Sequence, residues 1–117
     1  MRELNWNKLR IAHIEEAIGN IQKFTLHISQ EEFCSNDLVQ SGVLFQFSII
    51  GEAIIHVDPD KLTLVDYPWH FVRGFRNFIA HEYHKLKMEA VWNIIENELP
   101  KLKVKIQELK AIVDDKS

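Results

Sequence analysis

Four stretches of the chain carry apolar side chains at helical spacing. The first runs from about Asn5 to about Ile28, and its isoleucines recur every three, four or seven residues, at Ile11, Ile14, Ile18, Ile21 and Ile28. This spacing places them on one face of a helix. The second stretch, from about Asp37 to about Val57, is apolar on nearly every side. Such a helix is usually central, or faces both a core and a second subunit.

The third and fourth stretches lie in the second half of the chain. A helix is expected over about 68–81, because Pro68 suits a first turn, and its buried side is predicted from Phe71, Phe75 and Phe78. The last helix is expected to begin near Lys87. Its apolar stripe, Met88, Trp92, Ile95, Leu99, Leu102, Ile106, Leu109 and Val113, passes Pro100 without a change of phase. We therefore expect one long helix with a kink at Pro100.

Local signals separate these helices. Ser29 lies three residues before Glu32, which is the pattern of a capping box and predicts a short helical turn over 30–34. Asp58-Pro59-Asp60 ends the second helix, and 60–67 is expected to be a connection with at most one short turn. No strand pattern competes. The expected fold is an all-α antiparallel four-helix bundle with an extra short helical turn, in a single domain over residues 1–117.

The composition indicates the class of protein. The chain has 117 residues, of which 46% are hydrophobic and 26% charged, an ordinary globular balance. The sequence contains no uninterrupted run of about 18 apolar residues, so no membrane span is predicted. The first residues also lack the apolar region of a secretory signal. Cys34 is the single cysteine, so no internal disulfide can form, which favours a cytoplasmic location.

The charge is uneven along the chain. The formal net charge is -3, but residues 70–87 carry Arg73, Arg76, Lys85 and Lys87 against Glu82 alone. This basic island in an acidic protein permits contact with nucleic acid, although the overall charge does not require it.

Candidate chemistry lies within this island. On a helix Arg73, Asn77 and His81 follow one stripe, Arg76 lies beside Asn77, and Tyr83 comes next in the loop. We expect the two guanidiniums, the amide and the imidazole to share one polar face. An arginine fork can hold a phosphate and stabilise a phosphorane, and a histidine can move a proton near neutral pH. These groups suit metal-independent RNA cleavage, and a symmetric dimer would supply two of each.

The same residues have plainer interpretations. An Arg, Asn and His stripe is often a solvated or salt-bridged surface. Glu52 lies in the most apolar helix, so we expect it to need a partner, either Arg73 or Arg76, as structural support. Gly51 beside it is expected to permit a close helix approach.

Other polar residues give weaker signals. His81, His84 and Glu82 are too loosely spaced to predict a metal site, and no cofactor is expected. His13 either faces the candidate site from the first helix or lies on the surface. Cys34 is expected to be inert. The tryptophans are expected to be core or interface anchors; they are Trp6, Trp69 and Trp92.

The stretch Arg76-Asn77-x-x-Ala80-His81-x-Tyr83 closely resembles the Arg-x4-His-x-Tyr motif of the HepT-like ribonuclease toxins, a branch of the HEPN superfamily. Further matches occur in the same order, over about residues 9–110: His13-Ile14, Glu31-Glu32-Phe33, Ile50-Gly51-Glu52-Ala53, Pro68-Trp69, Val91-Trp92 and Leu99-Pro100. One departure is His70, where the family often has an arginine.

The resemblance implies a HEPN-like homodimer that cleaves RNA as the toxin of a type VII-like toxin–antitoxin pair. By carry-over Arg76 would stabilise the transition state and His81 would act as general acid or base. The candidates for holding RNA phosphate are Arg73, Asn77 and Lys85. The implied partner is an MNT-type minimal nucleotidyltransferase, the antitoxin, which would transfer AMP to Tyr83 and block cleavage.

Two other functions remain open at this point. The chain could be a non-catalytic helical binding module that positions a substrate or RNA for the nucleotidyltransferase. It could also be an inert helical dimer whose polar stripe is solvated. The presence of both an Arg and a His at the motif positions favours the enzyme.

Overall fold

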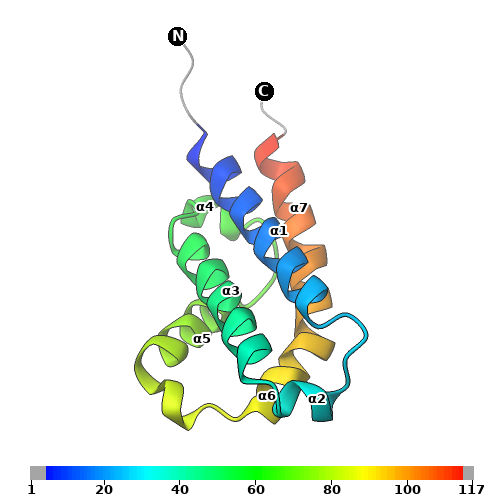
Figure 1. Ribbon diagram of the computed structural model, residues 1–117. Helices are drawn as coiled ribbons and strands as arrows, with labels where there is room; N and C mark the ends of the chain where they lie inside the picture. The colour runs from blue at the N-terminus through cyan, green and yellow to red at the C-terminus, as the bar shows by residue number, and fades with distance from the viewer. Residues whose placement is uncertain (1–4, 115–117) are drawn as a thin grey trace.

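The computed structural model describes residues 5–114, and within that range it is an all-α bundle without strands, as expected (Figure 1). The first four residues, on which the expectation about a signal partly rests, lie outside the described range. The helical elements in chain order are α1 (Trp6–Phe24), α2 (Gln30–Cys34), α3 (Asp37–Ile55), α4 (Pro59–Leu62), α5 (Trp69–Glu82), the 3-10 helix η1 (Tyr83–Lys85), α6 (Met88–Asn93), the π-helix η2 (Ile94–Glu98) and α7 (Leu99–Asp114).

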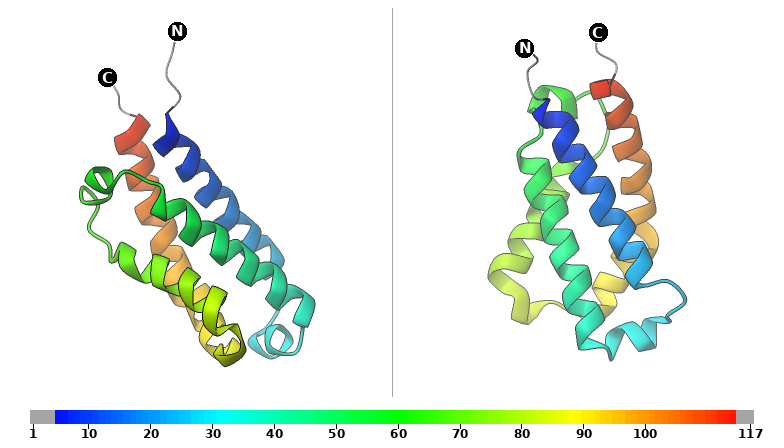
Figure 2. Two further views of the ribbon diagram at one scale, coloured as in Figure 1. Left: turned by 90° about the vertical axis from the view of Figure 1, so that its left-hand side faces the viewer. Right: turned by 45° about the horizontal axis from the view of Figure 1, so that its top comes forward.

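The core lies among α1, α3 and α7. Helix α1 packs against both of the others, and the start of α1 lies beside the end of α7 (Figures 1 and 2). The predicted stripe of α1 is buried: Ile11, Ile14, Ile18 and Ile21 are at most 2% exposed. On α7, Leu99, Ile106 and Leu109 are each at most 1% exposed. The heptad-like spacing therefore identified both helix faces correctly.

Helix α1 ends four residues earlier than expected. Thr25 closes it, because its hydroxyl donates a hydrogen bond to the Ile21 carbonyl at 2.8 Å. His27 then adopts a positive φ of 65°, which a continuing helix cannot include. Ile28 is half-buried beyond the helix, so its apolar character alone did not extend the helical backbone.

The short turn over 30–34 is α2, and its capping box is confirmed. The Glu32 backbone N–H donates to the Ser29 hydroxyl at 3.1 Å, and the Ser29 N–H donates to the Glu32 carboxylate at 2.8 Å. These bonds turn Phe33 into the core, where it is fully buried and its ring lies 5.4 Å from the ring of Trp92. Helix α2 thus closes one end of the bundle.

The last helix runs from Met88 to Asp114, but a π-turn over Ile94–Glu98 precedes Pro100. Pro100 has no N–H to donate to the preceding turn, and a wider turn accommodates this loss. The predicted stripe keeps its phase across Pro100, since Ile95, Leu99 and Leu102 are all buried. Upstream of the π-turn Val91 is the fully buried residue, while Met88 and Trp92 are only partly buried.

Helix α3 is long and apolar enough, by length and composition, to cross a membrane. It is also the helix on which α1 and α5 pack, and a central core helix passes the same test. Its polar residue Gln46 is buried and accepts a hydrogen bond from the Asn20 amide of α1 at 3.2 Å. Eight residues of α3 are buried in this packing, whereas Leu38, Phe45 and Ile55 are exposed.

Helix α5 lies at the side of the core and packs mainly against α3 (Figure 2). Of its fourteen described residues only Trp69 is buried. The predicted buried face was therefore wrong in two positions, since Phe71 is 67% exposed and Phe78 is 38% exposed. Phe75 is half-buried and meets Phe47 edge to face. Trp6, which was expected to be a core or interface anchor, is exposed.

Candidate functional site

The beginning of α5 is held in place by Trp69. Its indole N–H donates to the carbonyls of Leu62 and Val65, at 3.1 and 3.2 Å. These acceptors lie at the end of α4 and just after it, so the connection and α5 are joined by one buried side chain. Pro68 is the N-cap of α5, one position before the expected first turn. The helix that carries the candidate residues thus starts from a fixed point.

The crossing of α3 and α5 depends on Gly51. A Cβ atom added there would overlap the Cβ of Arg76 and lie 3.1 Å from the Val72 carbonyl oxygen. The expected close approach of the two helices is therefore present, and it places Arg76 directly over Gly51.

Replacing Gly51 by Ala should lower the free energy of unfolding by about 1–3 kcal/mol, because the helices must separate. This loss outweighs the gain in helix propensity, which is at most about 1 kcal/mol. Gly19 on α1 is the matched control, since a Cβ there meets nothing within 4 Å. Urea unfolding of G51A and G19A measures the difference. Equal stability of the two variants would contradict a tight α3–α5 crossing.

Arg76 is held by a row of polar contacts on the outer face of the crossing. Its Nη2 lies 3.1 Å from Oε1 of Glu52, and its Nη1 donates to the Asn77 amide oxygen at 3.1 Å. The other oxygen of Glu52 lies 3.2 Å from Nε2 of His56. The expected ion pair of Glu52 is therefore made with Arg76. Glu52 is not a buried carboxylate as expected, because its side chain is 48% exposed.

The end of α5 presents the other candidate residues. His81 is exposed in the last turn, and Tyr83 follows in η1 with 54% of its surface exposed. Lys85 is exposed too, and its Nζ lies 3.1 Å from a carboxylate oxygen of Glu82. These side chains are accessible to a large ligand.

Arg76 and His81 do not share one face within a protomer. They are five positions apart, and five steps of about 100° along an α-helix amount to about 500°, which leaves the two side chains about 140° apart around the helix axis. Arg76 is turned toward α3, where Glu52 holds it, and His81 is turned outward. Asn77 is exposed and Arg73 half-buried. The polar face expected from the sequence is therefore split.

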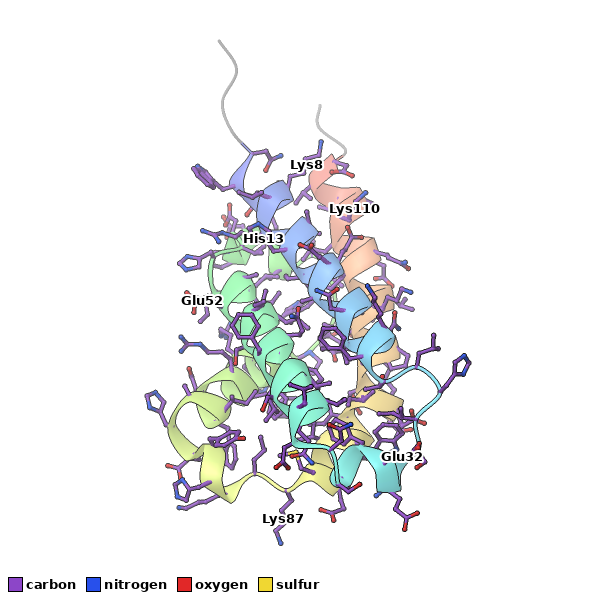
Figure 3. The ribbon with its side chains drawn as sticks, in the orientation of Figure 1. Lys8, His13, Glu32, Glu52, Lys87 and Lys110 are labelled. Carbon is purple, nitrogen blue, oxygen red and sulfur yellow. The ribbon has the colours of Figure 1, made fainter. Side chains whose placement is uncertain are left out.

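A polar groove extends from Arg76 across α3 to α1. It has a volume of about 360 Å³ and is lined by Arg10, His13, Phe45, Ser48, Ile49, Glu52, Ala53 and Arg76. Figure 3 shows that Glu52 and His13 lie on the same side of the molecule. His13, for which the sequence left two interpretations, is half-buried in this groove. The sequence did not predict that Arg10 and Phe45 belong to this site, because the residues that line the groove come from three different helices.

A second groove lies on the other side of α5. Its volume is about 410 Å³, and its walls are apolar apart from Glu98 and the Tyr67 hydroxyl; Phe71, Val72 and Phe75 form its α5 side. Burial, and then the nearby Glu98 carboxylate, raise the pKa of Tyr67. The exposed ring of Phe71 belongs to this groove.

Metal ligands and a reactive thiol are not prominent in the described part of the chain. Within residues 5–114 no group of three or more His, Cys, Asp or Glu side chains could hold a metal ion. Desolvation, and then Glu89, raise the pKa of the Cys34 thiol. A raised pKa disfavours the nucleophilic thiolate, in agreement with an inert cysteine.

The family model described as ribonuclease HepT-like matches residues 14–109. The chain belongs to the ribonuclease HepT-like family. This match confirms the resemblance seen in the sequence, and it includes both helices of the α3–α5 crossing and the whole Arg-x4-His-x-Tyr stretch.

Several named relatives match this HepT-like chain, and two of them come from archaea. The chain is 31% identical to "Probable ribonuclease HepT" of Thermococcus cleftensis over 98 residues, 83% of this chain and 89% of the relative. It is 28% identical to "Putative RNase MJ1380" of Methanocaldococcus jannaschii over 95 residues, 80% of this chain and 87% of the relative. No solved structure matches the chain significantly.

Proposed function

We propose that this HepT-like protein is a metal-independent endoribonuclease that acts as a toxin in the cytoplasm. The observation that carries the proposal is the pairing of Arg76 with Glu52 and Asn77, which fixes a guanidinium at the helix that also presents an exposed His81. The names of the two archaeal relatives, both ribonucleases, support RNA as the substrate.

The proposed reaction is an attack of a ribose 2′-oxygen on the adjacent phosphorus. A neutral His81 imidazole removes the 2′-hydroxyl proton, the new P–O bond forms, and the bond to the 5′-oxygen breaks. A protonated His81 of the other protomer gives its proton to that leaving oxygen. Arg76 stabilises the charge on the phosphorane. The products are a 2′,3′-cyclic phosphate and a 5′-hydroxyl.

This division of labour needs two protomers. Arg76 and His81 point about 140° apart on one α5, so one helix does not bring them to a common phosphate. We place the second copy against the outer face of α5, which carries Gly74 and His81 and where a Cβ at Gly74 would meet nothing within 4 Å. Arg76 starts from the opposite side of the helix, and its guanidinium would reach the shared phosphate around the edge of α5 where it contacts Asn77. The exposed rings of Phe71 and Phe78 on the same helix support burial by a second copy. In this arrangement Arg73, Asn77 and Lys85 hold the flanking phosphates.

Light scattering at micromolar concentration should give about twice the chain mass of 13.8 kDa. Replacing Gly74 by Arg should shift the protein to monomer and abolish cleavage, because a long charged side chain blocks approach of the second α5. The matched control is Gly19→Arg, since Gly19 is also an open helical glycine. A monomeric wild type, or a dimeric and active G74R, would contradict the two-protomer site.

The activity itself is tested on single-stranded RNA in EDTA, with analysis of the product ends. We expect cleavage to persist, because no step of the proposed reaction uses a metal, and we expect cyclic phosphate ends. RNA that is bound but never cut would favour the non-catalytic binding module instead. Activity lost in EDTA would contradict the proposed chemistry.

We also propose that a partner nucleotidyltransferase of the MNT type is the antitoxin and modifies Tyr83. The support is the exposure of the Tyr83 ring, 54%, at the end of the helix that carries Arg76 and His81. Lys85 and Arg73 lie on the same segment, so a phosphate on Tyr83 would occupy the cations that otherwise hold RNA.

A further inference from the structure

The polar groove between α1, α3 and α5 carries more than the proposed reaction uses. Arg76 forms one wall, and the groove continues over Phe45, Ser48 and Ile49 of α3 to Arg10 and His13 of α1. Its volume of about 360 Å³ lies within the range of ligand clefts. The cleavage chemistry accounts for Arg76 alone, and the far end of the groove has no role in it.

The charges of the groove suit an anion. Arg10 is half-buried and forms no ion pair with any residue in the range 5–114. Glu52 is the carboxylate of the groove; its charge is paired with Arg76 at 3.1 Å, and its other oxygen lies 3.2 Å from Nε2 of His56. Arg10 therefore remains the cation with unused donors at the end away from Arg76.

The groove also offers an aromatic face. The Phe45 ring is 64% exposed although it lies in the central helix of the bundle, and it lines the groove together with Arg10 and Arg76. Exposed aromatic rings next to arginines are the usual means of binding single-stranded nucleic acid, because bases stack on the ring while the cations hold the backbone.

We propose that this groove binds the RNA strand on one side of the scissile phosphate, with a base stacked on Phe45 and a phosphate further along the strand held by Arg10 and His13. The inference rests on the proposed ribonuclease function and extends its substrate contacts across α3 to α1. Single-stranded RNA is the occupant, because a duplex cannot present an unstacked base to Phe45. Phe45 and Arg10 contribute binding energy, and neither takes part in bond cleavage.

Binding is measured directly on the His81→Ala protein with a fluorescent single-stranded RNA of about ten nucleotides. Phe45→Ala should weaken binding by roughly 5- to 150-fold, the range for loss of one base–aromatic contact. Phe45→Trp keeps a stacking surface and should bind like the parent. Arg10→Ala should lower the slope of log K against log salt by about 0.7, as expected for one phosphate contact on a single strand.

Matched controls lie on the same two helices outside the groove. Leu38 on α3 is 83% exposed, and Lys23 lies in the last turn of α1, so Leu38→Ala and Lys23→Ala should leave binding unchanged. In protein with His81 intact, Phe45→Ala and Arg10→Ala should raise KM for RNA and leave kcat unchanged, because the contact is equal in ground and transition states.

Three outcomes would overturn the inference. Phe45→Ala and Arg10→Ala could bind RNA as tightly as the two controls. Phe45→Trp could bind as weakly as Phe45→Ala, which would contradict base stacking at this position. Phe45→Ala could instead convert a dimer to a monomer by light scattering, which would make the ring a subunit contact. If the wild type does not cut RNA at all, the proposed function fails, and the binding measurements on His81→Ala still decide the role of the groove.

Discussion

His81→Ala should lower the rate of RNA cleavage by about 10²- to 10⁴-fold, the usual contribution of a positioned general acid or base. The far-ultraviolet circular dichroism should remain that of the wild type, because His81 is exposed and supports no packing. The control is His84→Ala, an exposed histidine three residues further on that has no place in the proposed reaction. A wild-type rate for His81→Ala would exclude the proposed proton transfer.

In the proposed reaction Arg76 acts through its charge. Arg76→Ala should cost about 10²- to 10³-fold in kcat, as for loss of one oxyanion donor. Arg76→Lys should recover little of this, because an ammonium cannot contact Glu52, Asn77 and a phosphate with the geometry of the guanidinium fork. Full activity of Arg76→Lys would indicate that Arg76 supplies only a diffuse positive charge. Mixing Arg76→Ala with His81→Ala protein should not restore the wild-type rate, because each heterodimer holds only one of the two His81 side chains that the proposed reaction uses.

Tyr83→Phe should abolish modification by the cognate nucleotidyltransferase and leave the nuclease active in its presence. In the proposed transfer the Tyr83 hydroxyl oxygen attacks the α-phosphorus of ATP. The bond to the β-phosphate breaks, pyrophosphate leaves, and the hydroxyl proton is lost to solvent. The attached AMP adds a phosphate charge beside Lys85 and an adenine ring over the end of α5. Inhibition then requires occupation of the anion site and no refolding.

Intact mass after incubation with the nucleotidyltransferase, ATP and Mg²⁺ measures the transfer. The chain has two tyrosines, which makes Tyr67→Phe the matched control. Tyr67 is half-buried beside Glu98 in the apolar groove, where a transferase reaches its hydroxyl poorly. We expect Tyr67→Phe to gain the AMP-sized mass increase like the wild type. Modification of Tyr83→Phe to the same extent would show that the regulatory tyrosine is another residue or that there is none.

The sequence predicted best what depends on neighbouring residues. The Ser29–Glu32 capping box and the isoleucine stripe of α1 follow from spacing alone, and both are present. The end of α1 was missed because a positive φ at His27 leaves no mark in the hydrophobic pattern. The π-turn was missed because the sequence shows that Pro100 removes a donor but not how the preceding turn responds.

The site was predicted less completely because it combines elements that are distant in sequence. A carboxylate in an apolar helix needs a partner, so the pairing of Glu52 with Arg76 could be expected from the sequence. The exposure of Glu52 could not, because it depends on how far α5 covers α3. The pattern predicts that Phe71 and Phe78 are buried, but it does not say whether the same chain or another molecule would bury them, and in the single chain both are exposed. The groove over Phe45 needs the relative placement of three helices, which no local pattern contains.

The lateral position of α5 has a thermodynamic consequence. Only Trp69, of the fourteen residues of α5, is buried, so much of the surface of this helix is left uncovered by its own chain. Any molecule that covers the rest of α5 binds the docked helix better than a detached one, and so shifts the local equilibrium toward docking. In the proposed dimer, assembly and the ordering of Arg76 and His81 would be linked equilibria, and dilution should reduce the fraction of ordered sites along with the fraction of dimers.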